Sequence, residues 1–169
     1  MVAVPTFLEF VQLAEASAAE LVDGSNRDGR PFEPRRVEYV GMSFRRKILR
    51  FKVGKYDVEV RLPDLRVISK MKGSDVEKIK TALSGDIKVD CGCPDFRYGG
   101  FRFIGTQLGY SVKPEDRPPL VRNPEQAGTV CKHVTRLLGQ MDDYVDDIAA
   151  DFERSRKTKW YSSISRDVD

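Results

Sequence analysis

The order of hydrophobic and polar residues predicts a helix at the start of the chain. Residues 6–22 place apolar side chains on one helical face, and Thr6 with Glu9 forms the pattern of a capping box. Residues 23–34 are rich in Gly, Pro, Asn and Asp, which predicts a linker. The first helix is therefore an arm or an edge of the fold. It either docks on a partner or, as the plainer interpretation, packs on its own domain.

The stretch after this linker has the alternation of β-strands. The predicted strands are VEYVGMSF (37–44), KILRFKV (47–53), YDVEVRL (56–62) and, as a further candidate, LRVIS (65–69). The third of these alternates most regularly, with Tyr, Val, Val and Leu on one face and Asp, Glu and Arg on the other. A turn at Gly54-Lys55 separates the second strand from the third, so an antiparallel pairing is expected.

A short helix and another strand follow. Ser74 and Glu77 form a second capping box for a helix over residues 74–83, and Gly85 ends it. DIKV (86–89) predicts a strand that runs directly into the first cysteine.

The second half of the chain begins with an irregular segment. Residues 97–130 have weak periodicity, and the prolines within residues 113–128 exclude a long helix or a central strand there. A helical pattern covers residues 130–152, and the polar, basic tail after it is expected to be extended.

These elements predict an α+β fold built on a twisted antiparallel sheet. The expected organisation is an N-terminal helix and linker (1–34), an α+β domain (35–152) and an extended basic tail (153–169).

Composition narrows the class of protein without naming a function. The chain has 169 residues, 40% hydrophobic and 33% charged, with a net charge of +3, as in an ordinary soluble domain. No apolar run reaches the roughly 20 residues that span a bilayer, and the start MVAVPTFLEF lacks the features of a secretory signal. Three cysteines cannot all pair within one chain, which favours reduced thiols in a cytosol-like compartment.

All the soft metal ligands of the chain fall in two short motifs. The three cysteines and the single histidine are Cys91 and Cys93 in CGC, and Cys131 and His133 in CKH. Two close pairs of thiolate and imidazole ligands, one from a strand end and one from a helix start, are the donors of a structural zinc site. We therefore expect one structural Zn²⁺ that clamps a strand hairpin to the C-terminal helix and makes residues 35–152 a zinc-binding α+β domain. Gly92 allows a tight turn between the first two ligands, and Pro94 stops the strand.

These residues allow three other interpretations. The first is a set of ordinary buried cysteines with a stray histidine, the second is a redox or nucleophilic Cys131 assisted by His133, and the third is a catalytic zinc. A full set of four protein ligands leaves no open position for water, which argues against the last of these.

The motifs resemble a known family. Cys-x-Cys, a spacer and Cys-x-His is similar to the SWIM-type zinc finger, and this resemblance implies two strands followed by a helix and association with DNA or protein. Residues 94–130 make a longer spacer than in many members. The segments CGCPDFRY and RNPEQAGTVCKHV resemble those of small SWIM-like structural proteins of tailed bacteriophages, which implies a virion component made in the host cytoplasm.

Two basic clusters are candidate contacts for nucleic acid or for a protein partner. The candidates are Arg45, Arg46, Lys47, Arg50, Lys52, Arg154, Arg156, Lys157, Trp160 and Tyr161. The plainer interpretation of the first cluster is a solvated strand face, and of the second a tail lying along a neighbouring subunit. The aspartates between residues 142 and 151 lack the spacing of an EF-hand loop and indicate a solvent-facing or partner-facing helix.

No phosphate-binding glycine loop or nucleophile elbow occurs in the sequence, so no enzyme activity is expected. The expected function is a non-enzymatic structural or adaptor protein of a phage particle, in the neck, tail or baseplate rather than the capsid shell. It binds other virion proteins in a multi-copy assembly, and has no membrane or small-molecule partner. The alternative is a nucleic-acid-binding or regulatory protein that uses a SWIM zinc module.

Overall fold

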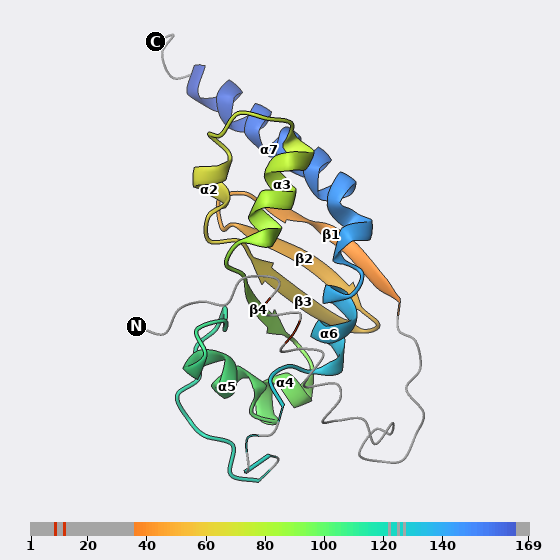
Figure 1. Ribbon diagram of the computed structural model, residues 1–169, viewed down its shortest axis with the longest axis vertical. Helices are drawn as coiled ribbons and strands as arrows, with labels where there is room; N and C mark the ends of the chain where they lie inside the picture. Colours follow the sequence, from red (N-terminus) through yellow and green to blue (C-terminus); the bar gives the residue numbers. More distant parts are fainter. Residues whose placement is uncertain are drawn as a thin grey trace.

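A computed structural model describes residues 36–164 except 122, 125 and 127, together with Glu9 and Gln12; for residues 158–164 it describes the backbone alone. It confirms the α+β class (Figure 1). The strands are β1 (Val37–Ser43), β2 (Ile48–Val53), β3 (Tyr56–Arg61) and β4 (Lys88–Cys91). The helices are α2 (Leu65–Ile68), α3 (Asp75–Ser84), α4 (Pro94–Tyr98), α5 (Phe101–Gln107), α6 (Lys132–Leu138), the 3₁₀ helix η1 (Met141–Tyr144) and α7 (Val145–Ile164).

The four strands form one antiparallel sheet in the order β1-β2-β3-β4. The β2–β3 hairpin turns at Gly54, whose φ of 60° is the left-handed conformation that glycine adopts without strain. In β3, Val58 and Val60 are fully buried, whereas Asp57 and Glu59 point to the other face. The predicted alternation therefore decides which face of the sheet meets the helices.

One face of the sheet carries the core, under α3, α6 and α7 (Figure 1). Helix α6 packs on β2, β3 and β4, and α7 packs on β1 and α3. Phe51 of β2 is 1% exposed and meets the ring of Tyr144 edge-on at 5.6 Å. Phe152 of α7 is fully buried and packs on Phe44.

Side chains of the helix layer cap the free edge of β1. The Tyr144 hydroxyl donates to the Val37 carbonyl at 2.9 Å, and Asp151 accepts from the Tyr39 hydroxyl at 2.9 Å and from the Met42 N–H. An open strand edge can pair with another chain, and these contacts engage two backbone groups of β1, the Val37 carbonyl and the Met42 N–H. Burial, with the bond to Asp151, raises the pKa of Tyr39 far above its usual range, so this contact is kept at physiological pH.

The structure confirms some local predictions and corrects others. Ser74 and Glu77 form the predicted capping box of α3, with the Glu77 N–H donating to the Ser74 hydroxyl at 3.2 Å. The expected strand at residues 65–69 is wrong: this segment is the short helix α2, because Leu65 and Ile68 lie one turn apart and are both buried.

The segment between the two ligand pairs is more ordered than the sequence predicted. It contains α4 and α5, and Phe96, Phe101 and Tyr110 belong to the hydrophobic core. After α5, the chain joins the β4 edge, where the Val89 N–H donates to the Tyr110 carbonyl at 2.8 Å. The prediction for residues 113–128 is confirmed for the described part, which has no helix or strand.

The C-terminal region departs from the prediction in two ways. The helical pattern of residues 130–152 is divided into α6, η1 and α7, because the chain turns at Gly139. Residues 153–164 continue α7 instead of forming an extended tail. Arg156 ties this part to α3, because one of its terminal nitrogens donates to both carboxylate oxygens of Asp75, at 2.6 and 2.8 Å.

The predicted N-terminal helix and linker (1–34) lie outside the described residues, apart from the helical Glu9 and Gln12. Within the described chain, no helix combines the length and the hydropathy needed to span a bilayer.

A buried carboxylate on β4 gives a test of how the inserted segment is held. Asp90 is 3% exposed and accepts from Arg102 at 2.6 and 3.1 Å and from Lys113 at 2.7 Å. Asp90→Asn leaves Arg102 without its carboxylate, whereas Lys113 keeps Glu59 at 3.3 Å. We expect the free energy of unfolding to fall by about 2–3 kcal/mol, less than for a fully buried pair because Lys113 is half exposed. Urea denaturation measures this change.

The matched control is Asp57→Asn, which changes an exposed carboxylate on the same face of the sheet. It should alter stability by no more than about 0.5 kcal/mol. Equal effects of the two substitutions would contradict the structural role of Asp90.

Candidate metal centre

The first ligand pair lies where β4 ends. Cys91 is the last residue of β4, opposite Val58, and its side chain points to the helix-covered face. The pairing continues for one residue, because the Gly92 N–H donates to the Asp57 carbonyl at 2.8 Å. A Cβ at residue 92 would lie 3.4 Å from that carbonyl oxygen, so the glycine permits a close approach to β3 rather than the tight turn that was predicted.

Cys93 begins helix α4. It is the N-cap residue, and its sulfur accepts from the Phe96 N–H at 3.3 Å. Pro94 takes the first helical position, where a missing N–H costs nothing. Pro94 therefore does stop the strand, by starting a helix.

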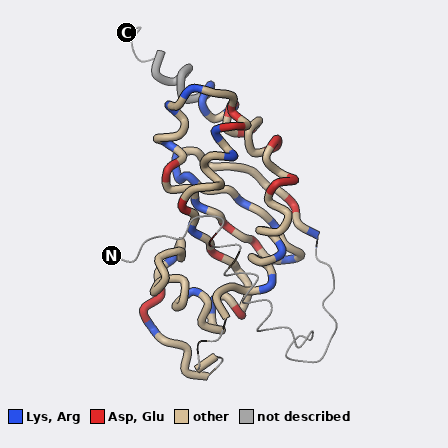
Figure 2. The backbone as a smooth tube through the Cα atoms, viewed as in Figure 1, with Lys and Arg blue, Asp and Glu red and all other residues tan. Residues whose placement is uncertain are grey.

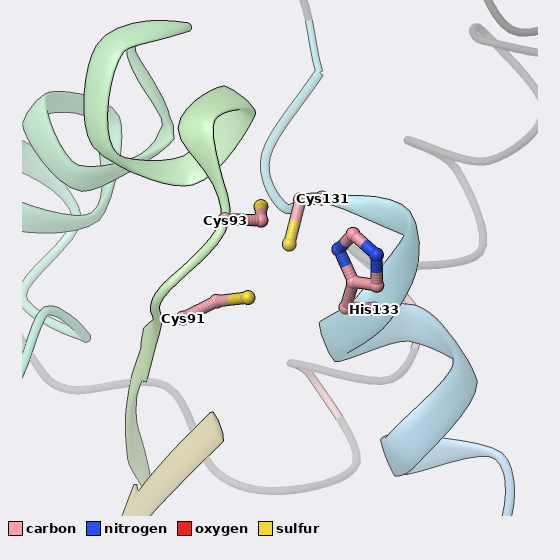
Figure 3. A group of neighbouring side chains, drawn as sticks. All are labelled: Cys91, Cys93, Cys131 and His133. Atoms are coloured by element: carbon pink, nitrogen blue, oxygen red, sulfur yellow. The ribbon is translucent and has the colours of Figure 1, made fainter. Parts of the chain in front are cut away.

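The second pair begins helix α6. Cys131 is its N-cap, and its carbonyl accepts from the Thr135 N–H at 3.1 Å. His133 lies two residues later, in the first turn, with its ring edge-on to Tyr56 at 4.8 Å between centroids. Residues two apart inside a helix lie on different sides, but the backbone of Cys131 is extended (φ −78°, ψ 158°), so its side chain and that of His133 converge on one point (Figure 3).

These four side chains converge from β4, α4 and α6 on one buried point (Figure 3). Their ligand atoms lie within 4.8 Å of one another, and no side chain is more than 2% exposed. Zn–S bonds of about 2.3 Å in a tetrahedron separate the donor atoms by about 3.8 Å, so a small contraction of this cluster encloses one ion. Residues Cys91, Cys93, Cys131 and His133 thus fit a metal site compatible with a zinc finger.

Hydrogen bonds among the three cysteines shift the pKa values of their thiols in opposite directions. Hydrogen bonds from Cys131 and Cys91, with contributions from His133 and the Phe96 N–H, hold the pKa of Cys93 far below its usual range despite burial. Burial, and the hydrogen bonds to Cys91 and Cys93, raise the pKa of the Cys131 thiol. These hydrogen bonds favour the thiolate form of Cys93, and a divalent cation would stabilise ionisation of the other two thiols.

A contact outside the ligand set supports the second pair. Tyr110 is fully buried, and its hydroxyl donates to the Thr129 carbonyl two residues before Cys131. Tyr110 itself is fixed by the backbone pairing with β4. The segment that returns to the second pair is thus held to the strand that carries the first. Neither this contact nor the Phe96 N–H was identified from sequence; the only signal was the apolar residues of a segment that otherwise has weak periodicity.

The first basic cluster is spread over a turn and a strand. Arg45 and Arg46 are exposed in the β1–β2 turn, Arg50 and Lys52 are exposed on the outer face of β2, and Lys47 donates to the Pro63 carbonyl at 2.7 Å. Of these five residues, only Arg50 and Lys52 lie on the outer strand face. Lys52 lies between two acids, directly opposite Glu38 on one side and Asp57 on the other.

The second basic cluster is mostly neutralised within the chain. Arg154 pairs with Asp151, Arg156 with Asp75 at 2.6 Å, and Lys157 with Glu153 at 2.7 Å. The side chains of Trp160 and Tyr161 lie outside the described part of the structure. The aspartates at residues 142, 143, 146 and 147 are exposed on η1 and the start of α7, where Figure 2 draws them red.

Comparison of the chain with family models, with curated proteins and with solved structures found no match in any of the three.

The geometry predicts one metal ion per chain. Protein purified without chelator should contain about one equivalent of zinc by elemental analysis. His133→Ala should weaken metal binding by more than the roughly 10–100-fold that loss of an outer-shell partner costs. Thr135→Ala, two residues along α6, is the control and should keep wild-type affinity for the metal. If neither the wild type nor this control contains metal, the prediction of a metal site is wrong.

The metal should also control access to the inserted segment. In the folded chain, Tyr110 is fully buried whereas Leu120 is 80% exposed. Cys131→Ala should therefore allow chymotrypsin to cleave after Tyr110 at least about tenfold faster, because opening costs at least about 1.4 kcal/mol less without the ligand. Mass spectrometry of the fragments measures the rates of cleavage after Tyr110 and after Leu120.

Cleavage after Leu120 serves as the internal control in the same experiment. Its rate should change little, because that bond is accessible in either state. An unchanged rate after Tyr110 would mean that the segment is held without the metal.

Proposed function

We propose that the chain is a non-enzymatic, zinc-stabilised structural or adaptor protein of a tailed-phage particle. The observation that carries the structural role is the complete, buried set of four soft ligands contributed by β4, α4 and α6. Four protein donors fill a tetrahedral zinc shell and leave no position for water or substrate. Zinc in such a site stabilises a fold rather than activating a nucleophile.

The adaptor role rests on a surface next to this site. Of the exposed large apolar side chains in the described chain, Leu120 at 80% and Val121 at 90% are the most exposed, and both lie in the segment between the ligand pairs. With Tyr98 and Phe103 they line an open groove. Exposed apolar side chains beside a rigid base are typical of protein–protein interfaces. The metal would fix the two ends of the segment that presents them.

The assignment to a virion is more specific. It is supported by the resemblance of the CPDF and RNP…CKH segments to those of small SWIM-like structural proteins of tailed bacteriophages. On this proposal the chain is made in the host cytoplasm. It binds neighbouring virion proteins of the neck, tail or baseplate through this loop and through the N-terminal segment and the end of α7.

Nucleic-acid binding is the second candidate function. It is favoured by one observation: several cations on the outer face of the sheet make no ion pair within the part of the chain that the structure describes.

Particle composition tests the primary proposal. Particles of the phage that encodes this chain, purified on a density gradient, should contain it in a fixed ratio to the major capsid protein by quantitative mass spectrometry. Cys131→Ala should reduce incorporation at least about tenfold, because an unfixed segment pays its ordering entropy on assembly. Thr135→Ala should be incorporated normally.

A second pair of variants separates the loop from the metal. Leu120→Ser with Val121→Ser should keep one zinc per chain and wild-type stability within about 0.5 kcal/mol, since both side chains are exposed. It should nevertheless lose incorporation. Particles that assemble fully and lack the chain altogether would overturn the virion role and leave the metal site untouched.

A further inference from the structure

The outer face of the sheet, opposite the helix layer, is ordered in rows across the strands. One row joins Ile48, Arg61 and Lys88 on β2, β3 and β4, and the next joins Arg50, Glu59 and Asp90. Cross-strand neighbours lie only about 5 Å apart. Arg61 and Lys88 are therefore two like charges in direct opposition, an arrangement that lowers stability unless something compensates for it.

More cations surround this row. Arg45 and Arg46 are exposed in the turn that leads into Ile48, and Arg66 of α2 donates to the Arg45 carbonyl at 3.3 Å. Arg50 is exposed one row away. We call this set the basic sheet face. It consists of Arg45, Arg46, Arg50, Arg61, Arg66 and Lys88.

Carboxylates of the chain do not neutralise this face. Within the described residues, no member of the basic sheet face forms an ion pair. Asp90 is occupied by Arg102 and Lys113. Glu59 lies opposite Arg50 across the strands, but it pairs with Lys113 at 3.3 Å, whereas Glu38 and Asp57, opposite Lys52, pair with no other cation within the described residues. The Nε of Arg61 is buried without a hydrogen-bond partner, so at least one N–H donor of this guanidinium is left unpaired within the chain. The six positive charges are left for an external anion.

The chemistry of the face distinguishes between kinds of anionic partner. The outward side chains of β2–β4 include one apolar residue, Ile48, which is 6% exposed, and no aromatic residue. A protein interface needs an apolar core, and a single-strand site needs aromatic platforms for the bases. Binding to a duplex backbone needs neither, because release of counterions from the phosphates supplies the free energy. Five of the six cations are arginines, whose planar guanidinium matches phosphate oxygens.

We propose that the basic sheet face binds the phosphate backbone of a nucleic-acid duplex without reading its bases. This inference does not depend on the metal site or on the virion assignment. It also revises the sequence-based set of contacts: Lys52 drops out because it lies between Glu38 and Asp57, and Arg61, Arg66 and Lys88 enter because strand pairing and α2 bring them beside the turn.

The test is binding of the full, zinc-loaded chain to a labelled 30-base-pair DNA duplex of arbitrary sequence, followed by fluorescence anisotropy across a salt series. Up to six phosphate contacts predict a slope of log K against log salt of about −3 to −5. Arg61→Gln with Lys88→Gln should lower the affinity at least about tenfold and make the slope shallower by about 2.

The matched control is Lys55→Gln with Lys80→Gln, which removes the same charge from exposed lysines away from this face. It should leave affinity within about twofold and the slope unchanged. Arg45→Gln with Arg46→Gln is a second, independent variant in an exposed turn, and it should reproduce the loss without affecting folding.

Three results would overturn the proposal. They are no binding at low salt, equal losses in the control and in both variants, or equally tight competition by polyglutamate of matched charge. The last would assign the face to an acidic protein surface. None of these results would change zinc content or particle incorporation, so the two proposals fail separately.

Discussion

The convergence of four buried ligand atoms at one point is the constraint on which much of the rest depends. Cys91 ends the last strand, Cys93 begins α4, and Cys131 and His133 begin α6. A single ion there would join an edge of the sheet, the inserted segment and the helix layer. Without an ion, the same place buries the polar atoms of three cysteines and a histidine in an apolar environment, which is costly. Binding of a metal would therefore be coupled to folding in this region.

Away from the metal, the fold is held by ordinary packing and by a few well-placed polar contacts. Phe51 and Phe152 fill the space between sheet and helices, and Arg156 fastens α7 to α3 through Asp75. Tyr144 and Asp151 cover the free edge of β1, and the chain around Tyr110 covers β4. Both edges of the sheet are thus engaged within the chain, which leaves loops and faces, rather than strand edges, for partners.

The two surfaces proposed for partners have different physical characters. The loop that carries Leu120 and Val121 offers apolar area on a base that a bound metal would fix. The outer face of the sheet offers positive charge with little apolar area, since Arg61 and Lys88 are adjacent and the nearby acids are already paired. These surfaces lie on different elements, so a protein partner and a nucleic acid need not compete for one site.

The sequence by itself determined the first three strands, the capping box at Ser74 and the four candidate metal ligands, because each of these depends on local chemistry. Alternation decides which face of a strand is buried, and no Cys or His exists outside the two motifs. Tertiary structure alone decided what depends on long-range contacts. Burial of Leu65 and Ile68 made a helix of a β-prone segment, and packing of Phe96 and Tyr110 ordered an insert with weak periodicity. Charge partners likewise follow from strand register and helix packing, which is why Arg61 and Lys88, far apart in sequence, join Arg45 and Arg46 on the basic sheet face.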